Sequence, residues 1–152
     1  MKKTQINALK RIIKNNKYRA ALQGMFEDAD GRAIACNDYC IVRFTYYERP
    51  EETPPAEGLS VEKFFNVTRG WDLAPPTVDE LKTIIRTANE NKTPALYDFG
   101  EGLPCVNARY LLDMLRIFPD AKIYRTEKEP KRKAIFFDSP FGDGLLMPVY
   151  KP

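Results

Sequence analysis

The first hydrophobic pattern along the chain has the spacing of a helix. Over residues 5 to about 17, Ile6, Leu9 and Ile13 recur at intervals of three or four positions, which is typical of an amphipathic helix that packs one face against a core. Basic side chains form a second stripe along the flank of this predicted helix: Lys3, Lys10, Lys14 and Lys17.

A β-type pattern follows this helix. The segments ALQGMFED and RAIAC, at 21–28 and 32–36, are separated by Ala29 and the pair Asp30-Gly31, and an Asp-Gly pair is a strong hairpin-turn signal. A third run, YCIVRFTYY at 39–47, is rich in β-branched and aromatic residues. The opening of the chain therefore predicts a helix followed by a three-stranded antiparallel meander.

The middle of the chain predicts a loop and an inserted helix. Residues 48–58 are rich in proline and acid, which indicates an exposed loop, and a short helical turn is expected over 61–65. Thr77 and Glu80 then form a capping box behind two prolines, which predicts a helix that continues to residue 91. The predicted buried stripe of that helix is Val78, Leu81, Ile84, Ile85 and Ala88.

The last third of the chain repeats the order of the first. A short strand is expected over 95–99 and a helix over 107–118, followed by candidate strands at 121–129, 132–139 and 144–151. Turn signals separate these last three strands at Glu129-Pro130 and at 140–144.

Together these patterns predict one α+β domain that spans 1–152, a length that suits a single hydrophobic core. Residues 1–46 form a first unit and 95–152 a second, each a helix with three or four antiparallel strands. Residues 47–94 contribute the loop and the inserted helix. An internal duplication of about 60 to 70 residues per unit fits this order.

The composition argues against catalysis. The chain has no histidine, which removes the commonest general base and the commonest transition-metal ligand. It also has no nucleophile with a nearby base, no phosphate-binding glycine loop and no nucleotide fingerprint. The three cysteines, Cys36, Cys40 and Cys105, supply no zinc or disulfide framework and are expected to be buried thiols. We expect a protein that is not an enzyme and has no cofactor.

One metal-dependent alternative stays open. The tripeptide Asp98-Phe99-Gly100 matches the kinase metal-binding motif, but the other kinase signatures are missing, so a turn is expected there. Acid next to glycine is typical of turns, and less often of sites for a hard cation such as magnesium. The carboxylates concerned are Asp98, Glu101, Asp138 and Asp143.

Charge is unevenly distributed along the chain. Seven of its 24 basic residues lie in the first 26 positions, where there is no acidic residue, so the remainder carries 17 basic and 21 acidic residues. A basic helix on a mildly acidic body suggests an anionic partner, and a merely solvated helix face is the alternative. No segment has the character of a signal peptide or a membrane span, so a cytoplasmic protein without membrane contact is expected.

Three stretches resemble the bacterial DNA polymerase III β sliding clamp. The segment VNARYLLDMLRIFPDAKIYRT, at 106–126, resembles that family's helix motif of Asn, two variable residues, Tyr, Leu, Leu and Asp, followed by a strand. The ending GLLMPVYK, at 144–151, is similar to its C-terminal strand, and 9–39 resembles the opening of a clamp domain. The resemblance covers roughly 5–46 and 95–151, and it implies a DNA-clamp-like fold.

In that family three such domains make a subunit, and two subunits form a ring of six domains around double-stranded DNA. This chain supplies one domain, and the resemblance implies self-association through its exposed sheet edges. It also implies that helices present basic side chains to DNA phosphates in a salt-sensitive contact. On the second helix we expect Asp113 to share the exposed face with two arginines, which leaves a net charge of +1 there. The matching positions for DNA are Lys3, Lys10, Lys14, Lys17, Arg109 and Arg116.

The resemblance further implies an apolar pocket that takes linear peptides from replication or repair proteins. The alternative is that its apolar members simply belong to the core. The leading hypothesis is a non-catalytic, sliding-clamp-like accessory protein of DNA replication or repair. The second is an adaptor of the same fold that binds a peptide or partner protein without encircling DNA. The positions that match the peptide pocket are Asn107, Tyr110, Leu146, Met147, Pro148 and Val149.

Overall fold

The computed structural model describes residues 1–14, 24–45, 60–127 and 134–150. The helices within these ranges are α1 (Lys3–Lys14), α2 (Glu62–Phe65), α3 (Val78–Asn91) and α4 (Ala108–Ile117). The strands of the first half are β1 (Phe26–Glu27), β2 (Ala33–Cys36), β3 (Cys40–Phe44) and β4 (Arg69–Gly70). Those of the second half are β5 (Leu96–Asp98), β6 (Cys105–Asn107), β7 (Lys122–Thr126), β8 (Ile135–Ser139) and β9 (Gly142–Leu146).

Two antiparallel meanders join into one sheet. Seven strands lie in the order β1-β2-β3-β9-β8-β7-β4, and every neighbouring pair is antiparallel. The first meander, β1 to β3, follows α1, and the second, β7 to β9, follows α4. They meet where β3 pairs with β9, from Cys40↔Leu146 to Phe44↔Gly142. The predicted mixed α+β architecture with antiparallel sheets is confirmed.

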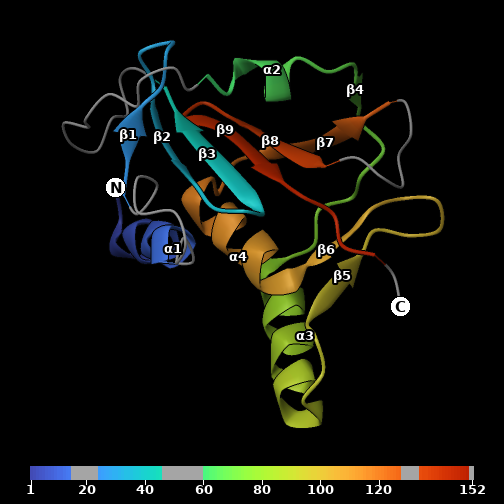
Figure 1. Ribbon diagram of the computed structural model, residues 1–152. Helices are drawn as coiled ribbons and strands as arrows, with labels where there is room; N and C mark the ends of the chain where they lie inside the picture. The colour runs from blue at the N-terminus through green and yellow to red at the C-terminus, as the bar shows by residue number, and fades with distance from the viewer. Residues whose placement is uncertain (15–23, 46–59, 128–133, 151–152) are drawn as a thin grey trace.

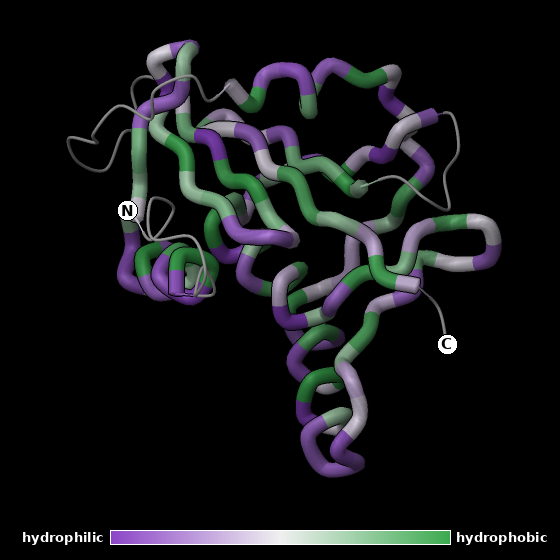
Figure 2. Tube along the Cα trace, in the orientation of Figure 1, coloured by the Kyte–Doolittle hydropathy of each residue, from purple (hydrophilic) through white to green (hydrophobic). Residues whose placement is uncertain are grey.

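The two faces of the sheet are covered differently. Figure 1 shows α1 and α4 on one side of the sheet and α2 on the other. The α1–α4 side holds the larger buried cluster, which includes Ile12, Leu111 and Phe137. The α2 side holds a smaller one around Phe65 and Tyr124. Figure 2 shows hydrophobic positions concentrated along the strands and along one side of the helices.

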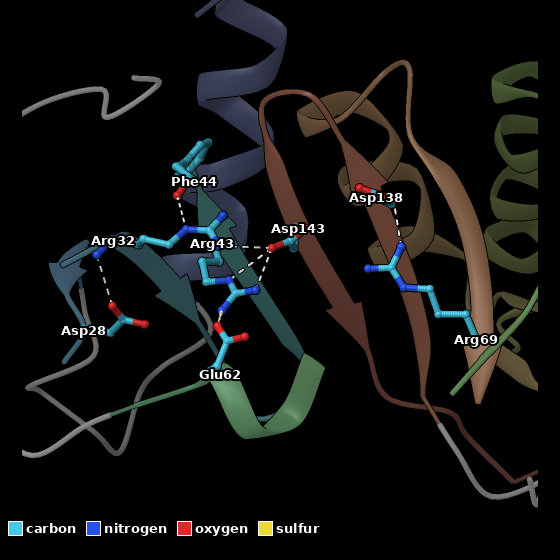
Figure 3. Close-up of polar contacts among 8 residues, drawn as sticks. All are labelled: Asp28, Arg32, Arg43, Phe44, Glu62, Arg69, Asp138 and Asp143. Carbon is cyan, nitrogen blue, oxygen red and sulfur yellow. Dashed lines mark hydrogen bonds and ion pairs between the residues drawn. The ribbon is translucent and has the colours of Figure 1, made fainter. Parts of the chain in front are cut away.

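Buried ion pairs fix the smaller layer to the sheet. On β9, Asp143 Oδ2 accepts hydrogen bonds from Arg43 Nη2 at 2.7 Å and from Arg32 Nη1 at 3.2 Å. Arg43 also binds Glu62 of α2 (Figure 3). Its guanidinium lies 4.3 Å from the centre of the Phe65 ring. Because Arg43 is only 4 % exposed, these partners are what make the burial of its charge tolerable.

The inserted helix has the predicted start, and its predicted buried stripe holds except at Val78, with Ile84 and Ile85 partly buried against the core. Thr77 Oγ1 accepts a hydrogen bond from the backbone N–H of Glu80 at 3.1 Å, so the capping box is confirmed in its essential contact. Leu81 and Ala88 are buried as predicted, but Val78 is 39 % exposed, which is a correction. Val78 is the first residue of α3, and Figure 1 shows α3 projecting from the body beside β5.

The last predicted strand is shifted. It was expected over 144–151, whereas β9 begins at Gly142 and ends at Leu146. The expected turn at 140–144 is correspondingly shorter. Pro148 has no N–H to donate to a ladder, and beyond it Val149 leaves the main sheet and forms a bridge with Cys105 of β6. The predicted loop at 48–58 and the turn at Glu129-Pro130 lie outside the described residues.

Close backbone approach at β9 gives the first prediction. A Cβ on Gly142 would lie 2.1 Å from the carbonyl oxygen of Arg43, and the φ of Gly142 is +155°. Gly142→Ala should therefore lower the free energy of unfolding by about 3 kcal/mol, measured by urea denaturation. Gly24→Ala, with open space around the new methyl group, is the matched control and should change it by less than about 0.5 kcal/mol. Equal stability of the two variants would show that the two meanders are not in such close contact.

Candidate functional site

A cavity of about 730 Å³ lies at the start of α4, beside the segment that follows β9. Four of the residues that line it were expected to bind peptide: Asn107, Tyr110, Met147 and Val149. The others are Tyr39, Thr93, Pro94, Leu96 and Tyr150. We call it the tyrosine cavity, because three tyrosines contribute to its wall.

Backbone hydrogen bonds hold the segment after β9 against two other elements. The N–H of Met147 donates to the carbonyl oxygen of Tyr39 at 2.8 Å, and the N–H of Val149 donates to that of Cys105 at 2.8 Å. This segment therefore runs from the β2–β3 turn to β6. As a result, side chains from distant parts of the sequence line one cavity.

The polar groups of the tyrosine cavity have distinct roles. Asn107 Oδ1 accepts hydrogen bonds from the backbone N–H groups of Arg109 and Tyr110, at 2.9 and 3.2 Å, and so caps α4. Its Nδ2 group has no hydrogen-bond partner within the part of the chain that the structure describes, so it remains a donor. The rings of Tyr39 and Tyr110 are stacked, with centroids 5.5 Å apart.

Two expected peptide-binding residues are placed elsewhere. Leu146 is fully buried in the larger core cluster and lies outside the cavity, so its assignment to the pocket is corrected. Leu146 is the last residue of β9 and packs in the core, whereas Met147 follows the strand and lies at the cavity. Met147 is 43 % exposed. Pro148 is half-buried and is also absent from the cavity wall.

The remaining wall residues could not be identified from local sequence. Tyr39, in the β2–β3 turn, is 50 % exposed and Tyr150 is 95 % exposed. Exposed aromatic side chains are a signal of binding surfaces, but the sequence alone does not show that these two are exposed. Pro94, between α3 and β5, and Leu96, the first residue of β5, lie where no functional residue was expected.

The basic residues do not form one continuous row. Lys3, Lys10 and Lys14 are exposed on α1 and have no ion-pair partner among the described residues, while Lys17 lies outside those residues. On α4, Arg109 donates to Asn89 of α3. Arg116 is half-buried and lines a different cavity.

Asp113 was expected on the exposed face of the second helix, and this was wrong. Its side chain is 8 % exposed, and Asp113 Oδ1 accepts two hydrogen bonds from Arg11 of α1, from Nη2 at 2.7 Å and from Nε at 2.9 Å. The contact forms because α1 packs along α4. Arg11 of α1 therefore holds the two helices together.

The other candidate groups have structural partners. Asp143 and Asp138 bind arginines, and Asp98 Oδ1 accepts from the backbone N–H of Gly100 within a turn. Within the described ranges, no three His, Cys, Asp or Glu residues are grouped to hold a metal ion.

The cysteines are free thiols, with Cys40 and Cys105 buried and Cys36 partly exposed. Burial raises the pKa of the Cys40 thiol well above its ordinary value, and the charge of Asp113 acts in the same direction. Cys40 therefore stays protonated, which makes it a poor nucleophile.

Comparison of the chain with models of protein families, with curated proteins and with solved structures finds no match. No helix among the described residues has the length and apolarity needed to cross a membrane.

The Arg11–Asp113 pair gives the second prediction. Arg11→Gln should lower the free energy of unfolding by about 1–2 kcal/mol, because it leaves the buried Asp113 carboxylate without its partner. Thermal or urea unfolding measures this loss, and Lys10→Gln, which removes an exposed charge from the same helix, is the control. Asp113→Asn in the Arg11→Gln background should recover part of the loss. Equal stability of Arg11→Gln and Lys10→Gln would contradict a structural role for the pair.

Proposed function

We propose that this chain is a non-catalytic, sliding-clamp-like accessory protein of DNA replication or repair, and that it acts by binding a short apolar segment of another protein in the tyrosine cavity. The observation that carries this proposal is the convergence of Asn107, Tyr110, Met147 and Val149 on one cavity. Those four residues belong to two separate segments that resemble the sliding clamp, one at the start of α4 and one after β9.

The architecture gives independent support for a clamp-like protein. Each half of the chain contains a helix followed by a three-stranded meander. In the sheet order β1-β2-β3-β9-β8-β7-β4, each meander runs inward from its first strand to its third, and the short strand β4 lies outside β7. Such an arrangement is expected of two related units that pair through their third strands. A shared architecture alone does not fix a function, so the cavity remains the main argument.

The chemistry of the cavity favours an apolar peptide. No charged side chain contributes to its wall within the described part of the chain, so burial of apolar side chains supplies most of the affinity. The Asn107 Nδ2 group is placed to donate to a backbone carbonyl of the bound segment. One directional hydrogen bond of this kind fixes the orientation of an otherwise apolar ligand.

A second candidate function is a contact with double-stranded DNA through α1. Its basis is that Lys3, Lys10 and Lys14 lie at positions i, i+7 and i+11 of one helix and are all exposed. Three ammonium groups on one face, without an ion-pair partner in the described part of the chain, suit phosphate contacts, which are independent of sequence and sensitive to salt. Without such contacts the chain is an adaptor that binds a protein partner and does not encircle DNA.

The third prediction tests the tyrosine cavity with a blocked peptide, acetyl-Gly-Leu-Phe-Leu-Gly-amide, in isothermal titration calorimetry. Tyr110→Ala and Met147→Ala should each weaken binding about tenfold, since each removes a large part of the apolar wall. Phe64→Ala is the control, because Phe64 is 45 % exposed on α2 and does not line the cavity.

Two outcomes would contradict peptide binding at this site. One is equal affinity of the Tyr110→Ala, Met147→Ala and Phe64→Ala variants for the apolar peptide. The other is equal binding of the polar peptide acetyl-Gly-Ser-Asn-Ser-Gly-amide by the unaltered protein, because an apolar wall should discriminate against it.

The fourth prediction concerns DNA. In fluorescence anisotropy with a short duplex of mixed sequence, the Lys10→Glu/Lys14→Glu variant should lose at least about tenfold in affinity at low salt. The slope of log affinity against log salt concentration should fall by about two, because two phosphate contacts are lost. The control reverses two exposed charges on α3, in Lys82→Glu/Arg86→Glu. Unchanged affinity in the α1 variant would leave only the adaptor function.

A further inference from the structure

A second cavity, of about 590 Å³, lies at the opposite end of α4 from the tyrosine cavity. It lies where the start of α1, the end of α4 and the β8–β9 turn come together. Its apolar wall includes Phe44, Val78, Leu115 and Phe141. Nothing in the proposed peptide or DNA contacts uses this space, and its volume is in the range of cavities that hold small molecules.

The group that distinguishes this cavity is Arg116. Its side chain is half-buried at the cavity wall, and it has neither a hydrogen-bond nor an ion-pair partner in the ranges the structure describes. Other arginines are paired with carboxylates: Arg11 with Asp113, Arg32 and Arg43 with Asp143, Arg69 with Asp138, and Arg125 with Asp72. A guanidinium that is partly removed from water and lacks a counter-charge is ready to receive an anion.

The charges around the cavity favour an anion, and a hydrogen bond holds the two sides of the cavity together. Lys2 lies on the wall with Arg116, and Asp120 is the acidic residue there, so these three side chains leave one net positive charge. Gln5 Nε2 donates to the carbonyl oxygen of Ile117 at 3.1 Å. That hydrogen bond joins the start of α1, which Lys2 directly precedes, to the end of α4, which carries Arg116, so the two sides of the cavity are held together without a ligand.

We propose that this cavity binds a small apolar carboxylate, with the carboxylate on the Arg116 guanidinium and the apolar body against Phe44, Leu115 and Phe141. The planar guanidinium offers two parallel N–H donors that match the two oxygens of a carboxylate. The aromatic and aliphatic wall provides the hydrophobic contribution to affinity. Such a ligand has two sources, a medium-chain fatty acid or the carboxyl terminus of a peptide with an apolar last residue.

Isothermal titration calorimetry with octanoate tests the site, with 1-octanol and acetate as probes that lack the charge and the apolar body. Octanoate should bind more tightly than either, and Arg116→Gln should weaken octanoate binding about tenfold or more. The charge-matched control is Arg86→Gln, which removes an exposed arginine of α3 that does not line the cavity. Val78→Phe narrows the cavity from a partly exposed position, and it should weaken binding while the charge stays the same.

A second arm separates the two sources. Acetyl-Ala-Leu-Leu with a free carboxyl terminus is compared with the same peptide as an amide. If the free acid binds more tightly than octanoate and Arg116→Gln abolishes this binding, the ligand of the site is a peptide terminus. If octanoate binds more tightly than the free acid and Arg116→Gln abolishes its binding, the ligand is a fatty acid. The proposal is overturned if neither carboxylate binds, if 1-octanol binds as tightly as octanoate, or if Arg116→Gln binds octanoate as well as Arg86→Gln does. Melting temperatures of all variants establish that each is folded.

Discussion

The fold depends on how closely β9 approaches its neighbours. Gly142 faces the backbone of β3, and a Cβ on Gly144 would lie 2.4 Å from Met114 Cε of α4. A side chain at Gly142 would push β9 away from its partner strand, whereas at Gly144 the flexible end of the Met114 side chain would have to move. Because β9 is the strand through which the second meander pairs with the first, the close approach at Gly142 allows the two meanders to form one continuous sheet.

Helix α4 organises both cavities. Its first residues, with the Asn107 cap, form part of the tyrosine cavity, and its last turn carries Arg116 into the second. Between them Asp113 binds Arg11, so α1 is fixed along the same helix. The two cavities differ in charge. The described residues around the first are uncharged, whereas the second contains Arg116, which has no hydrogen-bond or ion-pair partner within the described ranges. A single helix thus contributes to two cavities whose walls differ in chemistry.

Local signals predicted the fold better than the site. The Asp30-Gly31 turn, the Thr77 cap and the periodicity of α1, α3 and α4 are properties of neighbouring residues, and these elements form where the sequence places them. Strands β4 and β6 are two and three residues long, too short for a periodic pattern. Asp113 is buried because α1 packs along α4. Leu146 lies in the core and Met147 at the cavity because β9 ends between them. Neither can be derived from one segment alone.

The pairing of β3 with β9 also constrains the order in which the chain folds. Arg43 and Asp143 face each other across this pair although they are 100 residues apart in sequence. During synthesis on the ribosome, the first meander is complete long before β9 has been made, so the edge of β3 is left open for most of that time. Arg43 discourages other chains from using that edge, because a foreign strand would bury its charge without the cross-strand carboxylate that Asp143 supplies, and Glu62 alone would remain as its partner. The strand that finally occupies the edge is the one that brings Asp143 with it.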